Sequence, residues 1–192
     1  MAFGPHPDGL AIPKLSIGYP GDHTEMKLLD GPDENQGVLW LRNRAVMPGY
    51  LNRPEETEKR IRDGWYDTGD IMRRDGAGFF FFVGRADDMF VCGGENVYPA
   101  EVERLLEQHM DVAQAAVIAL ADEIKQNIPV AFIVAKPGAA ADVEDIKQFT
   151  IANGPAYQHP RFIGVLPELP LAGTNKIDRR ALLERAETEF HS

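Results

Sequence analysis

Polar and apolar side chains alternate over short stretches of the first 84 residues, and this pattern predicts a β-rich region. The alternation is clearest over 24–30 and 37–42, as expected for half-buried antiparallel strands. Asp, Gly and Pro residues predict chain reversals at 30–33 and 75–78. The predicted strands are 24–30, 37–42, 65–74 and 79–85.

One short helix is predicted within this β-rich region, over residues 52–62. Pro54 falls in its first turn, where the backbone N–H that proline lacks would have no helical partner. Acidic residues come early in the segment and basic residues late, which matches the helix dipole.

From about residue 88 the pattern changes to alternating helices and strands. Residues 99–110 begin with a proline and place Val102, Leu105, Leu106 and Met110 on one face, which predicts an amphipathic helix. Continuous apolar runs that are too short to span a membrane indicate buried strands. Further helices are predicted at 143–152 and 178–190, and strands at 112–120, 130–136 and 161–166.

The two parts meet between Val83 and Asp88, where an aromatic strand gives way to a glycine- and charge-rich turn. A link this short can act as a hinge, because hinges are a few loop residues that absorb a large dihedral change. A rigid turn between two domains explains the same residues equally well.

Composition and charge exclude several classes of function. The formal net charge of −10 argues against a general nucleic-acid or anionic-membrane surface. A single cysteine, Cys92, excludes an intrachain disulfide and a cysteine-cluster zinc site, and the five histidines are scattered without ligand spacing. No apolar run reaches the ~18 residues of a membrane span, and no export signal is recognisable, so a cytoplasmic location is expected.

Three groups of residues are candidates for chemistry. Asp70 follows Gly69 and can accept hydrogen bonds from a vicinal diol such as ribose, although a turn aspartate that binds backbone amides would look the same. Arg85, in a glycine-flanked turn, can reach a phosphate, or it can be part of a salt-bridged turn. Lys176 ends a small, polar loop and can place its charge on a phosphoryl oxygen, or it can be a solvated surface lysine.

Read together, the segments 49–70, 84–103 and 173–182 resemble the adenylate-forming enzymes. That superfamily comprises the acyl-CoA synthetases, the adenylation domains of nonribosomal peptide synthesis, and firefly luciferase. The likeness covers nearly the whole chain, with three motifs in the family's order. The opening residues 3–5 are similar to the tail of the family's aromatic-Gly-x-Thr-Glu motif, so the resemblance implies that the chain starts just downstream of it.

The resemblance implies a role for each matching residue. Asp70 corresponds to the aspartate that binds the ribose hydroxyls of ATP, and Arg85 to the arginine that contacts the ribose and phosphates. Asp87 corresponds to the hinge about which the C-terminal domain rotates between two half-reactions. Lys176 corresponds to the lysine that bridges the substrate carboxylate and the α-phosphate. The loop of Gly93, Gly94, Glu95 and Asn96 corresponds to the segment that lines the pantetheine tunnel after rotation.

The implied reaction has two steps. A carboxylic acid attacks the α-phosphorus of MgATP to give acyl-AMP and pyrophosphate, and the CoA thiol then displaces AMP. The implied partners are ATP, CoA and a small carboxylic acid, with Mg²⁺ bound through ATP and its protein ligands outside this chain. The isolated chain is expected to lack full activity, with an N-terminal domain supplied by the same full-length polypeptide.

The sequence departs from the family pattern in three respects. Asn175 replaces the usual glycine before the lysine, and Phe90-Val91-Cys92 replaces a commoner Ile-Lys-Ser/Gly-type run on the CoA side. The family's phosphate loop and its Tyr-Gly-x-Thr-Glu segment are absent from the 192 residues, so the acyl pocket is not here. An enzyme that loads a carrier protein, and a non-catalytic binding or interaction module, remain alternatives to a CoA ligase.

The hydrophobic pattern and the resemblance predict the same α+β fold. We expect a small, distorted β-barrel-like subdomain over 1–84, followed by an α+β domain over 85–192. The second domain should contain a central three-stranded sheet with flanking helices.

Overall fold

The computed structural model describes residues 2–173 and 175–190, and the chain divides into two compact units. We refer to residues 1–87 as unit 1 and to residues 88–192 as unit 2. The domain limits of 1–84 and 85–192 given above, with the functions attached to them, remain a prediction.

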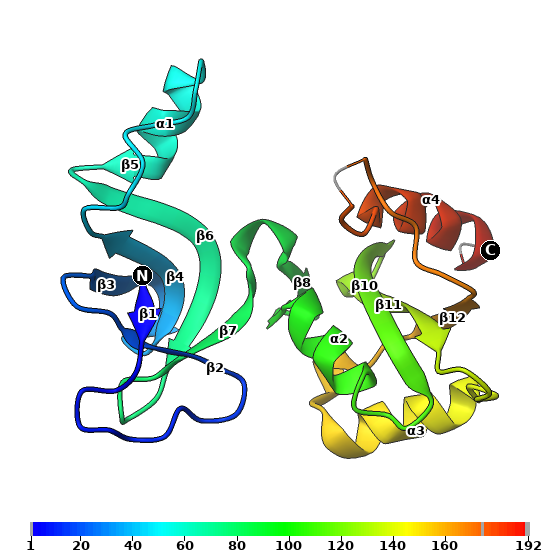
Figure 1. The fold of residues 1–192 in the computed structure, drawn as a ribbon. Helices are drawn as coiled ribbons and strands as arrows, with labels where there is room; N and C mark the ends of the chain where they lie inside the picture. Colours follow the sequence, from blue (N-terminus) through cyan, green and yellow to red (C-terminus); the bar gives the residue numbers. More distant parts are fainter. Residues whose placement is uncertain (1, 174, 191–192) are drawn as a thin grey trace. The chain divides into compact units, whose positions relative to one another are not determined.

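Unit 1 is built on a curled antiparallel sheet (Figure 1). Its strands follow the order β1-β2-β7-β6-β4-β3, and β5 pairs with β6. The core of this sheet consists of Leu39, Met72 and Phe80, with apolar side chains of β1, β3, β4 and β7 packed around them. The elements are β1 Phe3–Gly4, β2 Ser16–Pro20, β3 Glu25–Asp33, β4 Gln36–Arg42, α1 Pro54–Arg60, β5 Ile61–Arg62, β6 Trp65–Arg74, β7 Phe80–Arg85 and the 3₁₀ turn η1 Ala86–Asp88.

One of the two predicted reversals in unit 1 is displaced. Strand β3 continues to Asp33, and the chain turns back between Asp33 and its partner Gln36, so the prediction of a turn at 30–33 is wrong. The Asp33 carboxylate accepts a hydrogen bond from Asn35 N at 2.7 Å and holds the actual turn. Gly31 lets the strands approach here, because a Cβ at this position would lie 1.7 Å from the Gln36 carbonyl oxygen. The reversal at 75–78 is confirmed between β6 and β7.

The predicted helix at 52–62 is shorter in the structure and ends at Arg60. The next two residues form β5, which pairs with the start of β6 across a two-residue turn. Asp63 and Gly64 occupy this turn with φ of 52° and 76°, the left-handed values of a type I′ hairpin. This Asp-Gly turn explains the early end of the helix, because it draws residues 61–62 into the sheet.

Unit 2 is a three-stranded sheet covered on both faces by helices (Figure 1). Strands β10 and β11 are antiparallel, while β11 and β12 are parallel. Val117 and Ile133 face a core shared with α2, α3 and the β8–β9 hairpin, whereas Phe132 faces the core beneath α4. The elements are β8 Phe90–Cys92, β9 Glu95–Val97, α2 Pro99–Leu106, β10 Val112–Asp122, β11 Gln126–Ala135, α3 Val143–Asn153, the 3₁₀ turn η2 Ala156–Gln158, β12 Phe162–Leu166 and α4 Arg179–Phe190. The α+β prediction is confirmed.

One residue of the predicted helix face in unit 2 is placed differently. Helix α2 ends at Leu106, where i→i+3 hydrogen bonds to Leu105 O and Leu106 O replace the helical ladder. Met110 is therefore 77% exposed, while His109 takes the interior position and is 5% exposed. Among the described residues, no helix combines the length and apolar character needed to cross a bilayer.

Candidate functional site

The Thr68-Gly69-Asp70 segment of β6 is held rigidly by its own side chains and by its neighbours. Asp67 Oδ1 accepts from Gly69 N at 2.8 Å, and the Thr68 hydroxyl donates to Leu39 O at 2.8 Å while accepting from Asp70 N at 3.0 Å. Gly69 has φ of 69°, a left-handed conformation that suits glycine. The result is a fixed turn of the strand that carries the Asp70 carboxylate.

A bulge in β7 brings Asp70 and Arg85 together. Met72 pairs with Phe82, but Ile71 pairs with Gly84, so one residue is inserted in β7 and the register shifts by one. The shift places Arg85 directly opposite Asp70, whereas an unbroken register would place Arg85 opposite Gly69. Bulges of this kind commonly re-aim side chains beside active sites.

Arg85 binds Asp70 closely while both side chains stay accessible to solvent. Arg85 Nη1 donates to Asp70 Oδ1 at 2.7 Å and to Thr68 O at 2.8 Å. The hydrogen bond that Arg85 donates to Asp70 is the main reason that the pKa of Arg85 is raised above its ordinary value. The Asp70 side chain is 31% exposed and that of Arg85 is 40% exposed, so both groups can exchange partners with a ligand.

Asp87, the predicted hinge residue, is bound by two arginines of unit 1. Its Oδ2 atom lies 3.5 Å from Arg85 Nη2 and 3.3 Å from Arg60 Nη2. Arg60 Nη1 also lies 3.2 Å from Asp67 Oδ2. Burial opposes the charge of Arg60, but the neighbouring aspartates outweigh it, so the pKa of Arg60 is raised. We call these five residues, Arg60, Asp67, Asp70, Arg85 and Asp87, the charge cluster.

Sequence reasoning missed Arg60 and Asp67 as members of the charge cluster. Asp67 lies three residues before Asp70, and this proximity was the available signal for it. Arg60 lies 27 residues from Asp87, and no periodic pattern links a helix C-terminus to a turn that far along the chain.

The glycine pair predicted to line a pantetheine tunnel forms the tip of the β8–β9 hairpin in unit 2. Cys92 pairs with Glu95, and Gly93 and Gly94 turn between them with φ of 59° and 92°. A Cβ on either glycine would meet no atom within 4 Å, and Glu95 is exposed, so the tip is open. Gly93 N donates to Lys125 O at 2.9 Å, which ties the tip to the β10–β11 turn.

Lys176 lies in the loop between β12 and α4 and is exposed. Its carbonyl oxygen accepts from Ala172 N at 2.8 Å, and Leu171 bridges to Ile177, so the backbone of residues 171–172 pairs with that of residues 176–177. Asn175 has φ of 61°, which explains the departure from glycine, since asparagine tolerates the left-handed region best after glycine. Thr174, which belongs to the segment 173–182 compared above, lies outside the described residues.

Arg179, at the start of α4, anchors the far end of this loop. Its Nη1 atom lies 2.8 Å from Glu103 Oε1 and donates to Val117 O at 2.6 Å. Within the described residues, the ammonium of Lys176 takes part in none of the ion pairs. The backbone of Lys176 is thus restrained, while its exposed ammonium is free to contact a ligand.

The structure therefore gathers three predicted site residues into one group and leaves the others on separate segments. Asp70, Arg85 and Asp87 are joined by ion pairs within unit 1. The β8–β9 tip and the Lys176 loop belong to two different segments of unit 2. The roles given to these residues remain hypotheses.

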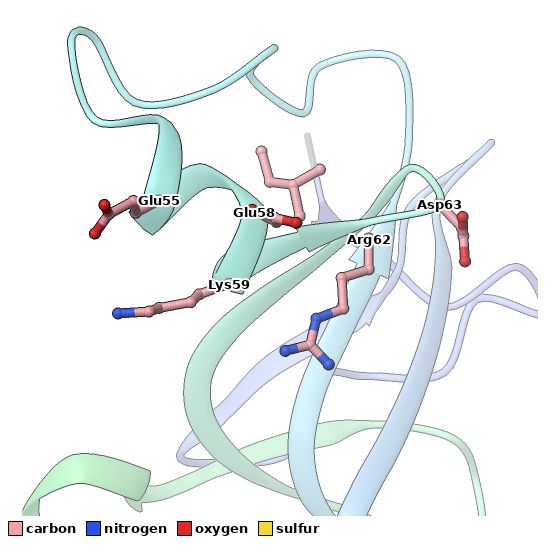
Figure 2. A pocket seen from close by; sticks show the side chains of 6 residues that line it. Glu55, Glu58, Lys59, Arg62 and Asp63 are labelled. Atoms are coloured by element: carbon pink, nitrogen blue, oxygen red, sulfur yellow. The ribbon is translucent and has the colours of Figure 1, made fainter.

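A separate hollow of about 700 Å³ lies beside α1 and contains none of the predicted site residues. Figure 2 shows charged side chains of both signs around it. Its lining residues are Glu55, Glu58, Lys59, Ile61, Arg62 and Asp63. No group of three His, Cys, Asp or Glu side chains within the described residues is placed to bind a metal ion, here or elsewhere.

Comparison with known proteins identifies the family. The family model of the AMP-binding enzyme C-terminal domain matches residues 101–176. A long-chain-fatty-acid–CoA ligase of Bacillus subtilis (strain 168) is 38% identical over 92% of this chain and 32% of its own length. A 2-succinylbenzoate–CoA ligase of Geobacillus sp. (strain WCH70) is 40% identical over 76% of this chain and 30% of its own length. The chain thus spans about a third of these relatives.

The structural comparison agrees with the sequence comparison. The crystal structure of the anthranilate CoA ligase AuaEII in complex with anthranoyl-AMP superposes with a TM-score of 0.84 and 31% identity. The match covers 97% of this chain and 37% of that one. The chain belongs to the adenylate-forming enzymes and represents their C-terminal portion, with the AMP-binding enzyme C-terminal domain at residues 101–176.

Proposed function

We propose that this chain is the C-terminal part of an ATP-dependent carboxylate–CoA ligase. A carboxylate oxygen attacks the α-phosphorus of ATP and expels pyrophosphate, which gives acyl-AMP. The thiol of CoA then attacks the acyl carbon, loses its proton and expels AMP, which gives acyl-CoA. The observation that carries this proposal is the charge cluster, because three residues assigned separately from motifs are joined there by ion pairs.

In this proposal the charge cluster binds the sugar and phosphates of the nucleotide. The Asp70 carboxylate accepts hydrogen bonds from the two ribose hydroxyls, for which its two oxygens are suited. Arg85 turns its planar fork towards the phosphates, and its exposure of 40% leaves room for that exchange. Asp87 lies in η1, at the limit of unit 1, and is the residue about which unit 2 rotates between the half-reactions.

Lys176 acts in the first step only. Its ammonium opposes the negative charge that grows on the α-phosphate, and a preorganised donor of this kind contributes on the order of 10²–10³ in rate by analogy with oxyanion-hole donors. After rotation, the open tip formed by Gly93, Gly94 and Glu95 takes its place and lines the path of the pantetheine arm. Glycine suits that task, because a backbone without Cβ atoms allows a ligand to approach closely.

Other components of the reaction are proposed to come from outside the 192 residues. Mg²⁺ arrives with ATP, and we place its protein ligands and the acyl pocket in an N-terminal part of the same polypeptide. The acid is an acyl or aryl carboxylate, since the relatives are named as ligases of both kinds. The cytoplasm, where ATP and CoA are both available, is the proposed location.

The test separates the two half-reactions in the full-length polypeptide. Lys176→Ala should lower acyl-AMP formation by about 10²–10³-fold while thioester formation from supplied acyl-AMP survives. Arg180→Ala is the matched control, because it also removes one positive charge. Arg180 lies four residues after Lys176, and its side chain is 88% exposed. Equal loss of both half-reactions in Lys176→Ala would contradict the role of this lysine.

The acceptor is tested by offering free CoA and a phosphopantetheine-loaded carrier protein to preformed acyl-AMP. Transfer to CoA supports the ligase, and transfer to the carrier alone identifies an enzyme that loads carrier proteins. If the full-length polypeptide binds ATP but forms no acyl-AMP from any acid, the role is that of a binding module and the ligase proposal fails.

A further inference from the structure

Arg60 contacts more carboxylates than either of the residues that the family pattern assigns to the nucleotide. It is the last residue of α1, the helix whose Glu55, Glu58 and Lys59 are exposed around the open hollow of Figure 2. The Arg60 side chain is only 24% exposed, and its guanidinium contacts Asp67 and Asp87 of the charge cluster. A long, charged side chain loses rotamer freedom in such a position, so its contacts must compensate for that loss.

The three nitrogens of the Arg60 guanidinium are each directed to a different carboxylate. Nε lies 3.5 Å from Glu56 of the same helix, and Nη1 lies 3.2 Å from Asp67. Nη2 lies 3.3 Å from Asp87 at the limit of unit 1. Asp67 is itself fixed, because its other oxygen accepts from Gly69 N. Arg60 is therefore held from α1 and β6, and its remaining nitrogen is aimed at the hinge residue.

Arg85 cannot hold Asp87 in the same way while Arg85 binds the phosphates of a nucleotide. Its Nη1 is engaged by Asp70 and Thr68 O, and its contact with Asp87 is the longer one at 3.5 Å. When Arg85 turns to a phosphate, Asp87 is left with Arg60. We propose that Arg60 is a positioning residue that keeps the Asp87 carboxylate against unit 1 while Arg85 is occupied by the nucleotide.

This inference rests on the proposed function and adds a residue to it. Rotation about Asp87 requires the carboxylate to leave Arg60, so the contact favours the hinge geometry before rotation. Loss of Arg60 should therefore slow acyl-AMP formation and spare the second half-reaction. An arginine is suited to the task, because its planar fork serves two carboxylates at once, whereas a lysine is a single point charge.

Hydrogen exchange in the 192-residue chain tests the positioning without any need for catalysis. Arg60→Gln should speed exchange of the backbone amides around η1 about three- to fivefold, as expected for the loss of three partly exposed ion pairs. Arg62→Gln is the matched control, since Arg62 is exposed, lies two residues away and carries the same charge. Arg60→Lys should fall between Arg60→Gln and the unaltered chain.

A double-mutant cycle distinguishes loss of the Arg60–Asp87 contact from a general loss of stability. Asp87→Asn breaks the same contact from the other side and leaves α1 intact, so it should speed exchange around η1 as well. The double variant Arg60→Gln/Asp87→Asn should then exchange no faster than the faster of the two single variants. Additive effects, or equal exchange in Arg60→Gln and Arg62→Gln, would overturn the proposal.

The half-reactions of the full-length polypeptide give a second, separate readout. Arg60→Gln should lower acyl-AMP formation about three- to fivefold relative to Arg62→Gln, with thioester formation from acyl-AMP unchanged. Equal slowing of both steps, or slowing of the second step alone, would overturn the positioning role. If the unaltered polypeptide forms no acyl-AMP at all, the proposed function fails, and the hydrogen-exchange cycle still decides whether Arg60 holds Asp87.

Discussion

Gly69→Ala should destabilise unit 1 by more than its backbone strain, because two arginines occupy the space that the new methyl group needs. The Cβ would lie 2.9 Å from Arg85 Nη2 and 3.0 Å from Arg60 Nη1. Both side chains must move, and the ion pairs to Asp70 and Asp87 weaken with them. With φ of 69°, an alanine here also pays the left-handed penalty of about 1–2 kcal/mol.

Gly64→Ala supplies the matched control for this substitution. Gly64 has a similar φ of 76°, but its Cβ would meet only Arg42 Cδ at 3.6 Å, an ordinary contact. Gly64→Ala should therefore lower the free energy of unfolding only by the left-handed backbone penalty of about 1–2 kcal/mol. In Gly69→Ala the weakened ion pairs lower the free energy of unfolding by about 1 kcal/mol beyond the backbone penalty, because partly exposed pairs contribute about 0.2–1 kcal/mol each.

Tryptophan fluorescence during urea unfolding isolates unit 1, because both tryptophans of the chain, Trp40 and Trp65, lie there. Gly69→Ala should unfold at lower urea than Gly64→Ala, and the gap should narrow in high salt, which screens exposed ion pairs. Equal midpoints for the two variants would refute the reasoning, since the arginines would then have moved aside without loss.

Three further predictions concern single contacts. The hydrogen bond to Tyr50, together with burial, raises the pKa of Tyr66 to about 12, so the folded state holds this proton more tightly. Unit 1 should therefore lose stability as the pH rises from about 10 to about 12, and Tyr66→Phe should flatten that loss in urea titrations. Asn175→Ala should lower the stability of unit 2 by about 1 kcal/mol while Asn175→Gly leaves it unchanged, measured by thermal unfolding followed by far-UV circular dichroism. Asp142 caps α3 by accepting from Glu144 N at 2.8 Å, so Asp142→Ala should cost about 1 kcal/mol in the same assay, and Asp142→Asn should cost less.

The sequence predicted best those elements whose periodicity agrees with their packing. The predicted strand at 65–74 matches β6 residue for residue, because its ends are set by strong turns on both sides. Strand β2, at Ser16–Pro20, was missed, since Gly18 and Pro20 are poor strand formers and a bulge interrupts its pairing with β7. Local composition predicts such a strand poorly when its neighbour in the sheet is distant in the sequence.

The sequence singled out three residues that the structure joins by ion pairs, but it did not predict their geometry. Motif order singled out Asp70 and Arg85, yet their ion pair depends on the inserted residue in β7, and nothing in the sequence marks that bulge. A regular hairpin would have separated the two charges by one register position. Arg60 was hidden for a related reason, because only the folded sheet brings the end of α1 to Asp87.

The most direct test of the account uses the polypeptide encoded by the complete reading frame. It would be incubated with MgATP, CoA and a panel of fatty and aromatic acids, with AMP and acyl thioester measured together. The account predicts AMP formation that requires both an acid and CoA, with one thioester formed per AMP, and little or none from the 192-residue chain alone. An intact polypeptide that binds ATP but yields no acid-dependent AMP or thioester with any member of the panel would contradict it.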